Sequence, residues 1–417
     1  MHLVRNFVGF FCKNPFSFPL EGEGWLTKFR TRCQITMKNS CKSQIKNPNM
    51  EWYQISNETA VPSPAMLLFP DRIQENIRRM VAIAGSPQRL RPHVKTHKLP
   101  QVVRMQLEAG ISRFKCATLS EAKMVAEAGA PDVLMAYPLY GPAVDQLFRL
   151  IAKYPDTLFS AIVDNPRHCR WLEKAAQAHG HPLDVFLDLD VGMGRTGIQP
   201  GPEALELYRS MARSPWLRPR GLHLYDGHLH IPSRAEREKA CDGSFAPVTE
   251  MIQILETEGL APEEVICGGS PTFPIHAQHP ERMLSPGTTL LWDARYASQF
   301  KDMDFLHAAV AFTRVVSKPG KDKLCLDLGH KAIASEMQPP RAAFFGVPEY
   351  QLAVHSEEHM VITFVRADDF ATGDCLYAIP SHICPTMALH GRVWAVEGNQ
   401  AVEQWPVVAR ERAVDWN

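Results

Sequence analysis

The sequence predicts an α/β fold: a (β/α)8 barrel of the TIM type followed by a C-terminal all-β domain. Over residues 65–297, short apolar runs rich in β-formers alternate with amphipathic stretches. This alternation is typical of parallel βαβ units, and about eight units are typical of a closed barrel rather than an open sheet. After Trp292 the helical rhythm stops, and short β-like runs are broken by Pro and Gly. This change predicts a second domain made of strands.

Hydrophobic periodicity assigns the elements of the barrel. Residues 65–69 form an apolar run that predicts the first strand, and the helix expected at 71–84 carries Ile73 and Ile77 at helical spacing. Further helices are expected at 120–128 and 202–212. The other barrel strands are expected at 90–94, 113–117, 133–136, 159–163, 183–189, 221–224 and 265–267.

The boundary between the domains is expected near residue 297, which gives a barrel over 65–297 and a β domain over 298–417. Residues 50–64 precede the barrel and are expected to hold a strand that returns to the β domain. The strands predicted in the β domain itself are 308–316, 323–328, 359–365 and 392–396.

The charge balance excludes several classes of protein. The 417 residues include 45 Lys and Arg against 45 Asp and Glu, so the formal net charge is zero. Neutrality gives no reason to expect a nucleic acid partner and favours a small ligand. No run of about 18 apolar residues occurs, which predicts a soluble protein without a membrane span. The ten cysteines lie far apart without a CxxC pair, which favours reduced thiols in a cytoplasmic protein.

Residues 1–49 differ in composition from the rest of the chain. They carry eight basic side chains and only two acidic ones, Glu21 and Glu23. A basic leader is typical of a targeting segment, but no clear small-residue cleavage site follows the apolar patch Phe7–Phe11. We therefore favour a disordered tail or an upstream start codon, with Met50 as the alternative first residue, over a transit peptide.

The C-terminal ends of barrel strands are where enzymes of this fold class place their catalytic groups. The densest polar cluster, Arg91–Lys98, follows the second expected strand and includes Lys95. Desolvation and neighbouring cations can lower the pKa of such a lysine and make it a nucleophile. The plainer alternative is that these residues form a solvated basic patch on the surface. The interpretation of Lys95 as a nucleophile is therefore supported only if functional residues also occur at other strand ends.

Two glycine-rich segments follow later strands. Arg195 could bind a ring nitrogen or an anion, and Thr196 adds a hydroxyl. In the second segment, Gly268 and Gly269 precede Ser270, and paired glycines let backbone N–H groups approach a phosphate. An ordinary loop is the alternative for each segment, although barrels often bind phosphate on their late loops.

Histidines occur in two further segments. The stretch Tyr225–His230 holds His228 and His230 after a strand, and each imidazole is either a structural residue or a general base. His382 and Cys384 are expected on an extended segment, where alternate side chains point to one side. Imidazole and thiolate suit zinc, and two protein ligands leave room for water or substrate. A chance pair is the alternative.

Together these segments resemble the fold-type III pyridoxal-phosphate enzymes of the D-threonine aldolase and D-serine dehydratase group, which are relatives of alanine racemase. The resemblance covers residues 60–410, with the motifs in family order. Alanine racemase itself is less similar, because it lacks the HxC pair and carries a catalytic tyrosine that has no clear counterpart here. The motifs are RPHVKTHK at 91–98, DVGMGRTG at 190–197, GGSPTFP at 268–274, SPGT at 285–288, SEEH at 356–359 and PSHICPT at 380–386.

The resemblance implies a role for each motif residue. Lys95 would be joined covalently to pyridoxal 5'-phosphate, Arg195 would lie near the pyridine nitrogen, and Tyr225 would line the site. The family also implies a homodimer in which the barrel of one subunit meets the β domain of the other. The remaining implied contacts are Thr196, Gly268, Gly269 and Ser270 for the phosphate, and His382 and Cys384 for a divalent metal (Zn, Mn or Mg).

The same parts would serve two reactions on a D-3-hydroxy-amino acid. If His228 or His230 removes the hydroxyl proton, the Cα–Cβ bond breaks and D-threonine becomes glycine and acetaldehyde. If Lys95 removes the Cα proton instead, hydroxide leaves, as in a D-serine or D-threo-3-hydroxyaspartate dehydratase. We favour the aldolase, because the Gly-His-Leu-His loop offers a base for the hydroxyl. A non-catalytic pyridoxal-phosphate carrier fits poorly with a second domain and a metal pair.

Overall fold

Seven parallel strands build most of the barrel in the computed structural model, which describes residues 50–416. The predicted leader, residues 1–49, lies outside the described residues. The strands follow one another around the sheet in sequence order, from β2 to β8. Their bounds are β2 Arg113–Cys116, β3 Asp132–Met135, β4 Leu158–Val163, β5 Leu183–Leu189, β6 Leu217–Leu224, β7 Glu264–Cys267 and β8 Arg282–Leu284.

Residues 90–93 take the eighth position of the barrel. Leu90 pairs in parallel with Leu284 of β8, and His93 pairs in parallel with Lys115 of β2. The strand expected at 90–94 is therefore reduced to two isolated bridges, which close the ring between its first and last strands. Eight positions around one ring confirm the predicted (β/α)8 barrel.

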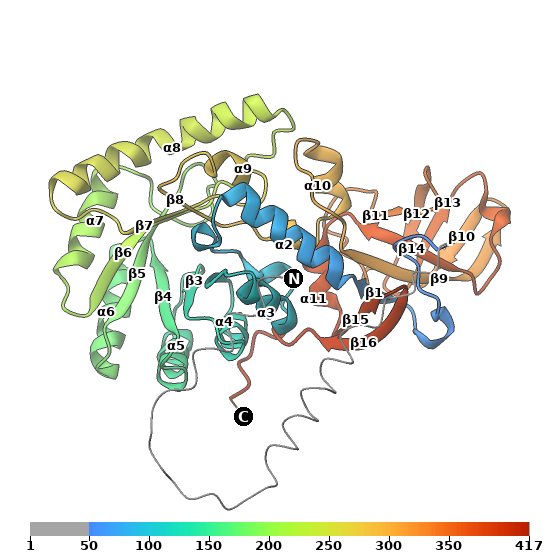
Figure 1. The fold of residues 1–417 in the computed structure, drawn as a ribbon, viewed down its shortest axis with the longest axis horizontal. Helices are drawn as coiled ribbons and strands as arrows, with labels where there is room; N and C mark the ends of the chain where they lie inside the picture. Colours follow the sequence, from blue (N-terminus) through green and yellow to red (C-terminus); the bar gives the residue numbers. More distant parts are fainter. Residues whose placement is uncertain (1–49, 417) are drawn as a thin grey trace, which may run out of the picture. The chain divides into compact units, whose positions relative to one another are not determined.

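Helices surround the barrel strands (Figure 1). Most begin with a proline, whose missing N–H costs no hydrogen bond in the first turn, and α2 and α6 end at left-handed glycines, Gly85 and Gly180. The helices predicted at 71–84, 120–128 and 202–212 are confirmed as α2, α4 and α7. The bounds are α2 Pro70–Ala84, α3 Pro100–Glu108, α4 Leu119–Glu127, α5 Pro142–Lys153, α6 Pro166–His179, α7 Pro202–Arg213, α8 Arg234–Thr257 and α9 Phe273–His276. None of the helices within residues 50–416 is both long enough and apolar enough to cross a bilayer.

The second domain is a nine-stranded, mostly antiparallel sheet. Its main path runs β12-β13-β10-β9-β1-β15-β16, while β14 pairs with β9 and β11 pairs with β14. The four strands predicted here are confirmed as β9, β10, β13 and β15. The bounds are β1 Ala65–Leu68, β9 Ala309–Gly320, β10 Lys323–Leu326, β11 Ala342–Phe344, β12 Gln351–His355, β13 Met360–Thr363, β14 Cys375–Pro380, β15 Arg392–Glu397 and β16 Gln400–Pro406.

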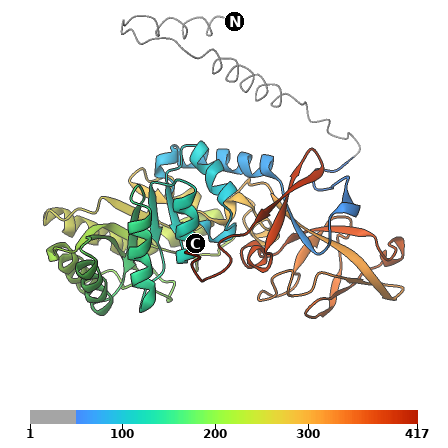
Figure 2. The same ribbon diagram turned by 90° about the horizontal axis from the view of Figure 1, so that it is seen from below.

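Strand β1 belongs to the β domain, so the prediction that residues 65–69 form the first barrel strand is wrong. It pairs antiparallel with β9 and parallel with β15, and it is visible as the blue segment among orange and red strands in Figure 2. All four residues of β1 are buried, so its sequence has no polar face that would identify its partners. Residues 50–64 were expected to hold the returning strand, but they form turns and the 3-10 helix η1 (Glu58–Ala60). They still pack on the β domain, where Ser56 N donates to Asn399 O.

The interior of the barrel is packed, and charges close its N-terminal end. Arg91 is fully buried, with hydrogen bonds to Asp132 at 2.6 Å and to Glu264 at 2.9 Å. A packed interior directs ligands to the C-terminal ends of the strands. The apolar cluster above the charges comprises Leu134, Ile162, Phe186 and Ile266.

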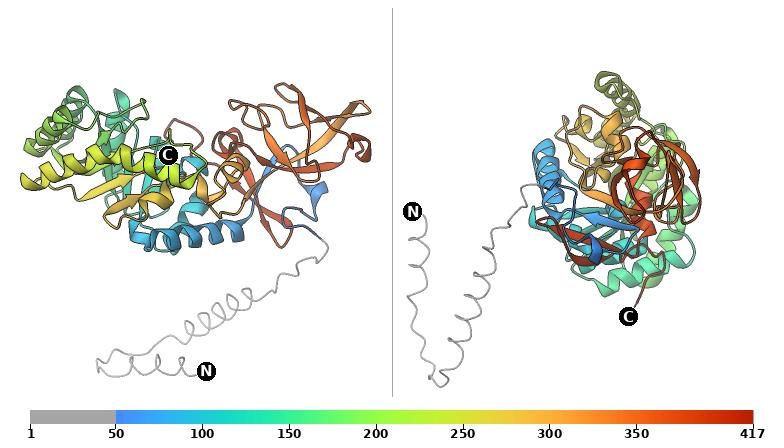
Figure 3. Two further views of the ribbon diagram at one scale, coloured as in Figure 1. Left: turned by 90° about the horizontal axis from the view of Figure 1, so that it is seen from above. Right: turned by 90° about the vertical axis from the view of Figure 1, so that its right-hand side faces the viewer.

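The two domains meet at the C-terminal ends of the barrel strands, and Figure 3 shows the β domain beside the barrel. Three short elements lie in this junction: η4 (Thr288–Leu290), α10 (Ala294–Gln299) and α11 (Ile383–Leu389). Across it, Ile383 N donates to Asp293 Oδ2 at 3.3 Å. The junction therefore brings the β domain against the predicted catalytic end of the barrel.

Candidate active site

A cavity of about 450 Å³ opens at the junction of the two domains. Seven of the predicted site residues line it, so motifs from both domains are gathered in one place. The seven are Lys95, Tyr225, His230, Gly269, Ser270, His382 and Cys384. The rest of the lining is His93, Lys115, Met193, Gly227, Ser285, Gly287, Thr288, Asp293, Arg295, Tyr296, Met337 and Ser381.

Lys95 lies in a short 3-10 helix, η3 (Val94–Thr96), directly after the bridging segment. His93 caps this helix, because its Nδ1 accepts a hydrogen bond from Lys95 N at 3.3 Å. Burial and the charge of Lys95 hold the pKa of His93 well below its usual value, so the imidazole stays a neutral acceptor. After the helix, Lys98 adopts φ 56° and pairs through Nζ with Glu121. These contacts fix the backbone from which Lys95 enters the cavity.

Three cationic side chains surround the ring of Tyr225. Lys95 Nζ lies 5.6 Å, Lys115 Nζ 5.9 Å and the guanidinium carbon of Arg195 5.0 Å from the ring centroid. Among the described residues that line the cavity, the only carboxylate is that of Asp293. Burial raises the pKa of Asp293 to about 6, which weakens even that negative charge. The excess of positive charge suits an anionic ligand.

The loop after β7 brings backbone N–H groups to the cavity wall. Gly268 has φ 73°, and a Cβ at this position would lie 2.6 Å from the ring of His276. A Cβ on Gly269 would lie 2.7 Å from the ring of Tyr225. Both positions therefore require glycine, and of the two Gly269 lines the cavity.

Ser270 joins this loop to the loop at 285–288. Its Oγ accepts hydrogen bonds from the backbone N of Gly287 at 3.1 Å and of Thr288 at 3.0 Å. Two loops with converging N–H and hydroxyl groups form the kind of concave surface that binds phosphate.

A buried polar network holds the glycine loop from behind. Asp226 Oδ2 lies 2.8 Å from His276 Nε2, and Thr272 Oγ1 donates to Asp226 Oδ1 at 2.7 Å. Thr272 Oγ1 also accepts from Gly269 N at 3.3 Å. Burial alone would raise the pKa of Asp226, but the hydrogen bonds from His276 and Thr272 lower it, so the carboxylate stays ionised. Sequence reasoning missed this network, because its partners lie 46 and 50 residues apart.

Asp226, Cys241 and His276 also place potential metal-ligand atoms within 4.8 Å of one another. These atoms already contact one another, with Cys241 Sγ 3.4 Å from His276 Nε2. On the other side of the ring, Arg282 Nη1 lies 3.1 Å from His276 Nδ1, so a metal here would meet a cation. We interpret the cluster as structural support for the loop.

His382 and Cys384 lie together, although the extended segment predicted for them is wrong. His382 is the N-cap of α11, and Cys384 lies in its first turn. The His382 ring contacts Glu336 Oε1 through Nδ1, and it also interacts with the side chain of Cys384. Burial would lower the pKa of His382, but the bond with Cys384 raises it to about 9. Burial in turn would raise the pKa of Cys384, but the interaction with His382 lowers it below its usual value.

The structure separates the two candidate bases. His230 lines the cavity, and burial lowers its pKa, so its imidazole is neutral near pH 7. His228 is exposed and lies beside Gly192, outside the cavity lining. Arg195, Thr196 and Gly268 also fall outside the described residues that line the cavity, although Arg195 lies over the ring of Tyr225.

Several cavity residues escaped sequence prediction. Lys115 is buried, and burial lowers its pKa to about 7. The available signal was a lysine inside the otherwise apolar run Phe114–Cys116. Arg295 and Tyr296 could not be found, because they belong to the junction between domains rather than to a strand end.

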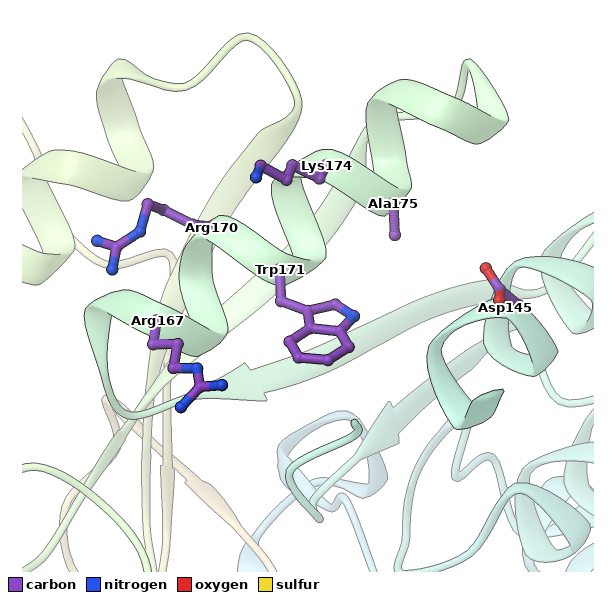
Figure 4. A pocket seen from close by; sticks show the side chains of 6 residues that line it. All are labelled: Asp145, Arg167, Arg170, Trp171, Lys174 and Ala175. Carbon is purple, nitrogen blue, oxygen red and sulfur yellow. The ribbon is translucent and has the colours of Figure 1, made fainter. Parts of the chain in front are cut away.

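A separate hollow of about 460 Å³ lies on the outer helices of the barrel (Figure 4). Arg167, Arg170, Trp171 and Lys174 of α6 line it, and Asp145 of α5 faces them. It contains none of the predicted site residues and no strand end. The cavity at the junction is therefore the candidate active site.

Two family models match the chain. The alanine racemase N-terminal domain matches residues 70–294, and the putative serine dehydratase domain matches residues 308–396. The first range covers the barrel with its α2 helix, and the second covers most of the β domain.

Similar proteins of known activity cover most of this chain. A D-threonine aldolase of Arthrobacter sp. is 29% identical over 358 residues, which are 84% of this chain and 93% of the relative. A 3-hydroxy-D-aspartate aldolase of Paracoccus denitrificans (strain Pd 1222) is 30% identical over 368 residues, 85% of this chain and 93% of the relative. A D-threo-3-hydroxyaspartate dehydratase of Delftia sp. (strain HT23) is 26% identical over 375 residues, 82% of this chain and 96% of the relative.

The fold matches a solved structure equally broadly. The crystal structure of D-threonine aldolase from Filomicrobium marinum superposes with a TM-score of 0.79 at 28% identity, and the match covers 86% of this chain and 98% of that one. With the barrel matched by a family model and the whole architecture shared with these relatives, the chain belongs to the alanine racemase N-terminal domain family.

Proposed function

We propose that the protein is a lyase, dependent on pyridoxal phosphate and a divalent metal, that cleaves D-3-hydroxy-amino acids between Cα and Cβ to glycine and an aldehyde. The observation that carries the proposal is that Lys95, His230 and the His382–Cys384 pair line one cavity. The aldolase names of the relatives at 29% and 30% identity support it. An amine, a neutral base and a metal pair in one place are the parts that this cleavage needs.

The donors of the cavity fit pyridoxal phosphate. The loops at 268–270 and 285–288 would hold the phosphate through N–H and hydroxyl groups, since bare glycine backbone is required there by packing. Lys95 would hold the aldehyde carbon, and Arg195 would lie beside the ring. The excess of positive charge around Tyr225 is the property that a dianionic cofactor calls for.

The pair of His382 and Cys384 fits a divalent metal. The pKa of the thiol is lowered toward the thiolate that binds metals, and Glu336 holds the opposite nitrogen of the imidazole. A carboxylate behind a ligating histidine is the usual arrangement around protein metal sites. Two protein ligands would leave coordination positions for the substrate oxygen. This donor set suits zinc well, and manganese or magnesium less.

The chain's residues select the bond that breaks. Pyridoxal phosphate, when bound, withdraws electrons from the bonds at Cα of an amino acid. The neutral imidazole of His230 accepts the proton of the β-hydroxyl, while His382 and Cys384 would hold a metal that lowers the pKa of that hydroxyl. Removal of the hydroxyl proton favours Cα–Cβ cleavage. Tyr225 and Tyr296 line the cavity with aromatic rings that exclude water.

A dehydratase is the second candidate, supported by the match of residues 308–396 to a putative serine dehydratase domain and by the relative from Delftia sp.. In that reaction Lys95 removes the Cα proton and the β-hydroxyl leaves. The test is product identification: the protein is incubated with D-threonine and Mn²⁺ or Zn²⁺, and glycine and acetaldehyde are assayed against 2-oxobutyrate and ammonia. Glycine without keto acid supports the aldolase, and the reverse product set contradicts it. L-threonine and the Lys95→Ala variant serve as controls.

We also propose a cytoplasmic homodimer in which the barrel of one subunit faces the β domain of the other. The seven described cysteines are free thiols, as a reducing compartment requires. Light scattering of the active protein tests the oligomer, since an active monomer would contradict it.

A further inference from the structure

Lys115, His223 and Asp188 form a buried hydrogen-bonded chain inside the barrel that the proposed function leaves unused. They lie on β2, β6 and β5, with side chains from distant parts of the sequence. Lys115 Nζ lies 3.4 Å from His223 Nε2, and His223 Nδ1 lies 2.7 Å from Asp188 Oδ1. Their exposed fractions are only 2%, 4% and 2%. Ionisable groups this deep are costly to keep unless they are paired.

The contacts show which atoms donate and which accept among Lys115, His223 and Asp188. Asp188 accepts the Nδ1–H of His223, so the other ring nitrogen, Nε2, presents a lone pair to Lys115. Burial lowers the pKa of His223, so the imidazole remains neutral. Lys115 can donate to Nε2 whether its amine is charged or neutral. The second oxygen of Asp188, Oδ2, is buried and has no hydrogen-bond partner among the described residues. The negative charge of Asp188 is therefore balanced only from the side of His223 and Lys115.

The chain opens into the cavity only at its Lys115 end, because Lys115 lines the cavity while His223 and Asp188 do not. Lys115 and Lys95 place their amines 5.9 and 5.6 Å from the centre of the Tyr225 ring, so two amines serve one binding space. Burial and the charge of Lys95 lower the pKa of Lys115 to about 7, against the opposite effect of the carboxylates. The ionisable groups that face Lys115 are Lys95, Arg91, His93, His223, Asp188, Asp226 and Tyr225.

On the basis of the proposed lyase function, we propose that Lys115 is a second catalytic amine, held by His223 and Asp188, that donates the proton gained by Cα when glycine forms. The N–H bond of Lys115 breaks, and a C–H bond forms with the electron pair that the broken Cα–Cβ bond leaves on Cα. His230 holds the proton removed from the β-hydroxyl. After the products leave, His230 releases that proton to water and Lys115 takes one from water, so the cycle balances.

The first experiment separates the two products in time. Holoenzyme is mixed with excess D-threonine, and acetaldehyde and glycine are quantified from milliseconds to minutes in the wild type and in Lys115→Met. Aldehyde release needs no proton at Cα, but glycine release does. We expect Lys115→Met to give a burst of one acetaldehyde per active site, followed by glycine release at least about 100-fold slower than in the wild type.

The Lys115→Arg variant tests whether Lys115 acts by donating a proton or only by its positive charge. Arginine keeps the positive charge but does not release a proton at neutral pH. The inference therefore predicts that Lys115→Arg shows the same aldehyde burst as Lys115→Met. Full glycine release in Lys115→Arg, or an equal loss of both products without a burst, would overturn it. Lys123→Met, at a lysine of α4 that pairs with Glu127 and does not line the cavity, is the matched control and should behave as the wild type.

A second measurement does not depend on turnover. The absorbance of the bound cofactor is recorded against pH without substrate, because loss of the Lys115 charge changes the electrostatic field in the cavity. We expect one pH-dependent transition in the wild type, its loss in Lys115→Met and its shift in His223→Gln. Identical titrations in all three proteins would contradict the inference. Failure of the lyase proposal is recognised separately, since the wild type would then release no aldehyde.

Discussion

Thr96 Oγ1 lies 3.1 Å from Cys384 Sγ, so the residue after Lys95 on the barrel contacts a thiol of the β domain. Thr288 Oγ1 lies 3.5 Å from the same sulfur. Both hydroxyls belong to barrel segments, so the pair proposed to bind a metal is held against the barrel close to the amine proposed to bind the cofactor. We therefore expect the two groups to occupy separate places that are close enough to act on one substrate.

Metal removal should lower turnover without releasing the cofactor. His382 and Cys384 lie on the β domain, whereas the proposed phosphate contacts lie on the barrel. Loss of a Lewis acid costs several kcal/mol in the transition state, so we expect a decrease of about 100-fold or more. Metal content, cofactor absorbance and rate are measured after dialysis against a chelator. Cys384→Ala should reproduce the effect and Cys375→Ala should not, while an unchanged rate after verified metal removal would exclude the metal role.

Glu336→Gln should weaken metal binding without removing a ligand. The carboxylate contacts Nδ1 of His382 and would thereby hold the ring in one orientation. Removing such an outer partner lowers metal affinity or activity by about 10- to 100-fold. Competition with a fluorescent chelator measures the affinity, with Glu349→Gln, at an exposed position, as the control. If the metal affinities of Glu336→Gln and Glu349→Gln were equal, Glu336 would have no part in metal binding.

Lys95→Ala should abolish the protein-linked cofactor band and the activity, because Lys95 is the amine that η3 brings into the cavity. Borohydride treatment and peptide mapping of the wild type should find the adduct on Lys95. Lys123→Ala should retain both band and activity. An adduct on another residue, Lys115 included, would refute the assignment.

Asp226→Asn should weaken cofactor binding. The carboxylate holds Thr272, which in turn accepts from the backbone N of Gly269. Hydrogen bonds to charged groups contribute about 1.5–3 kcal/mol, so we expect the Kd for pyridoxal phosphate to rise about 10- to 100-fold. Thr272→Val should act in the same direction. The control is Asp242→Asn on α8, and a Kd unchanged in Asp226→Asn would show that the loop keeps its shape unaided.

The sequence correctly predicted the strands and helices that are recognisable from neighbouring residues alone. Strand β5 is seven buried residues between turn signals, and it was found where expected. Strand β8 has only three residues and was missed. Strand β1 was assigned to the wrong domain, since its partners β9 and β15 lie more than two hundred residues away. Partner choice by a fully buried strand depends on the whole fold.

The site was predictable where residues follow strands. Lys95, Gly269 and Ser270 were found from motifs at strand ends, and all three line the cavity. Lys115 was not found, because a lysine between two apolar residues of a strand does not by itself show that its side chain faces a ligand. For His382 and Cys384 the expected extended geometry was wrong, yet the N-cap and first turn of α11 bring both residues to the cavity.

Stability at low pH should depend on Asp132. Burial would raise the pKa of Asp132, but the charge of Arg91 and the hydrogen bond from it lower the pKa below the unfolded value of 3.8. A carboxyl whose folded pKa is depressed stabilises the protein above the unfolded pKa and loses that contribution as pH falls through the folded pKa. The loss should therefore begin below about pH 4 in the wild type.

Asp132→Asn should remove this part of the pH dependence and also lower stability at pH 7. Breaking a buried ion pair costs about 3–5 kcal/mol, because Arg91 keeps its charge without one of its partners. Thermal unfolding midpoints at pH 7, 5 and 3.5 measure both effects. Asp145→Asn, at an exposed carboxylate, is the control and should keep the wild-type profile. If the midpoints of Asp132→Asn and the wild type fell in parallel from pH 5 to 3.5, the ion pair with Arg91 would not be the source of the acid sensitivity.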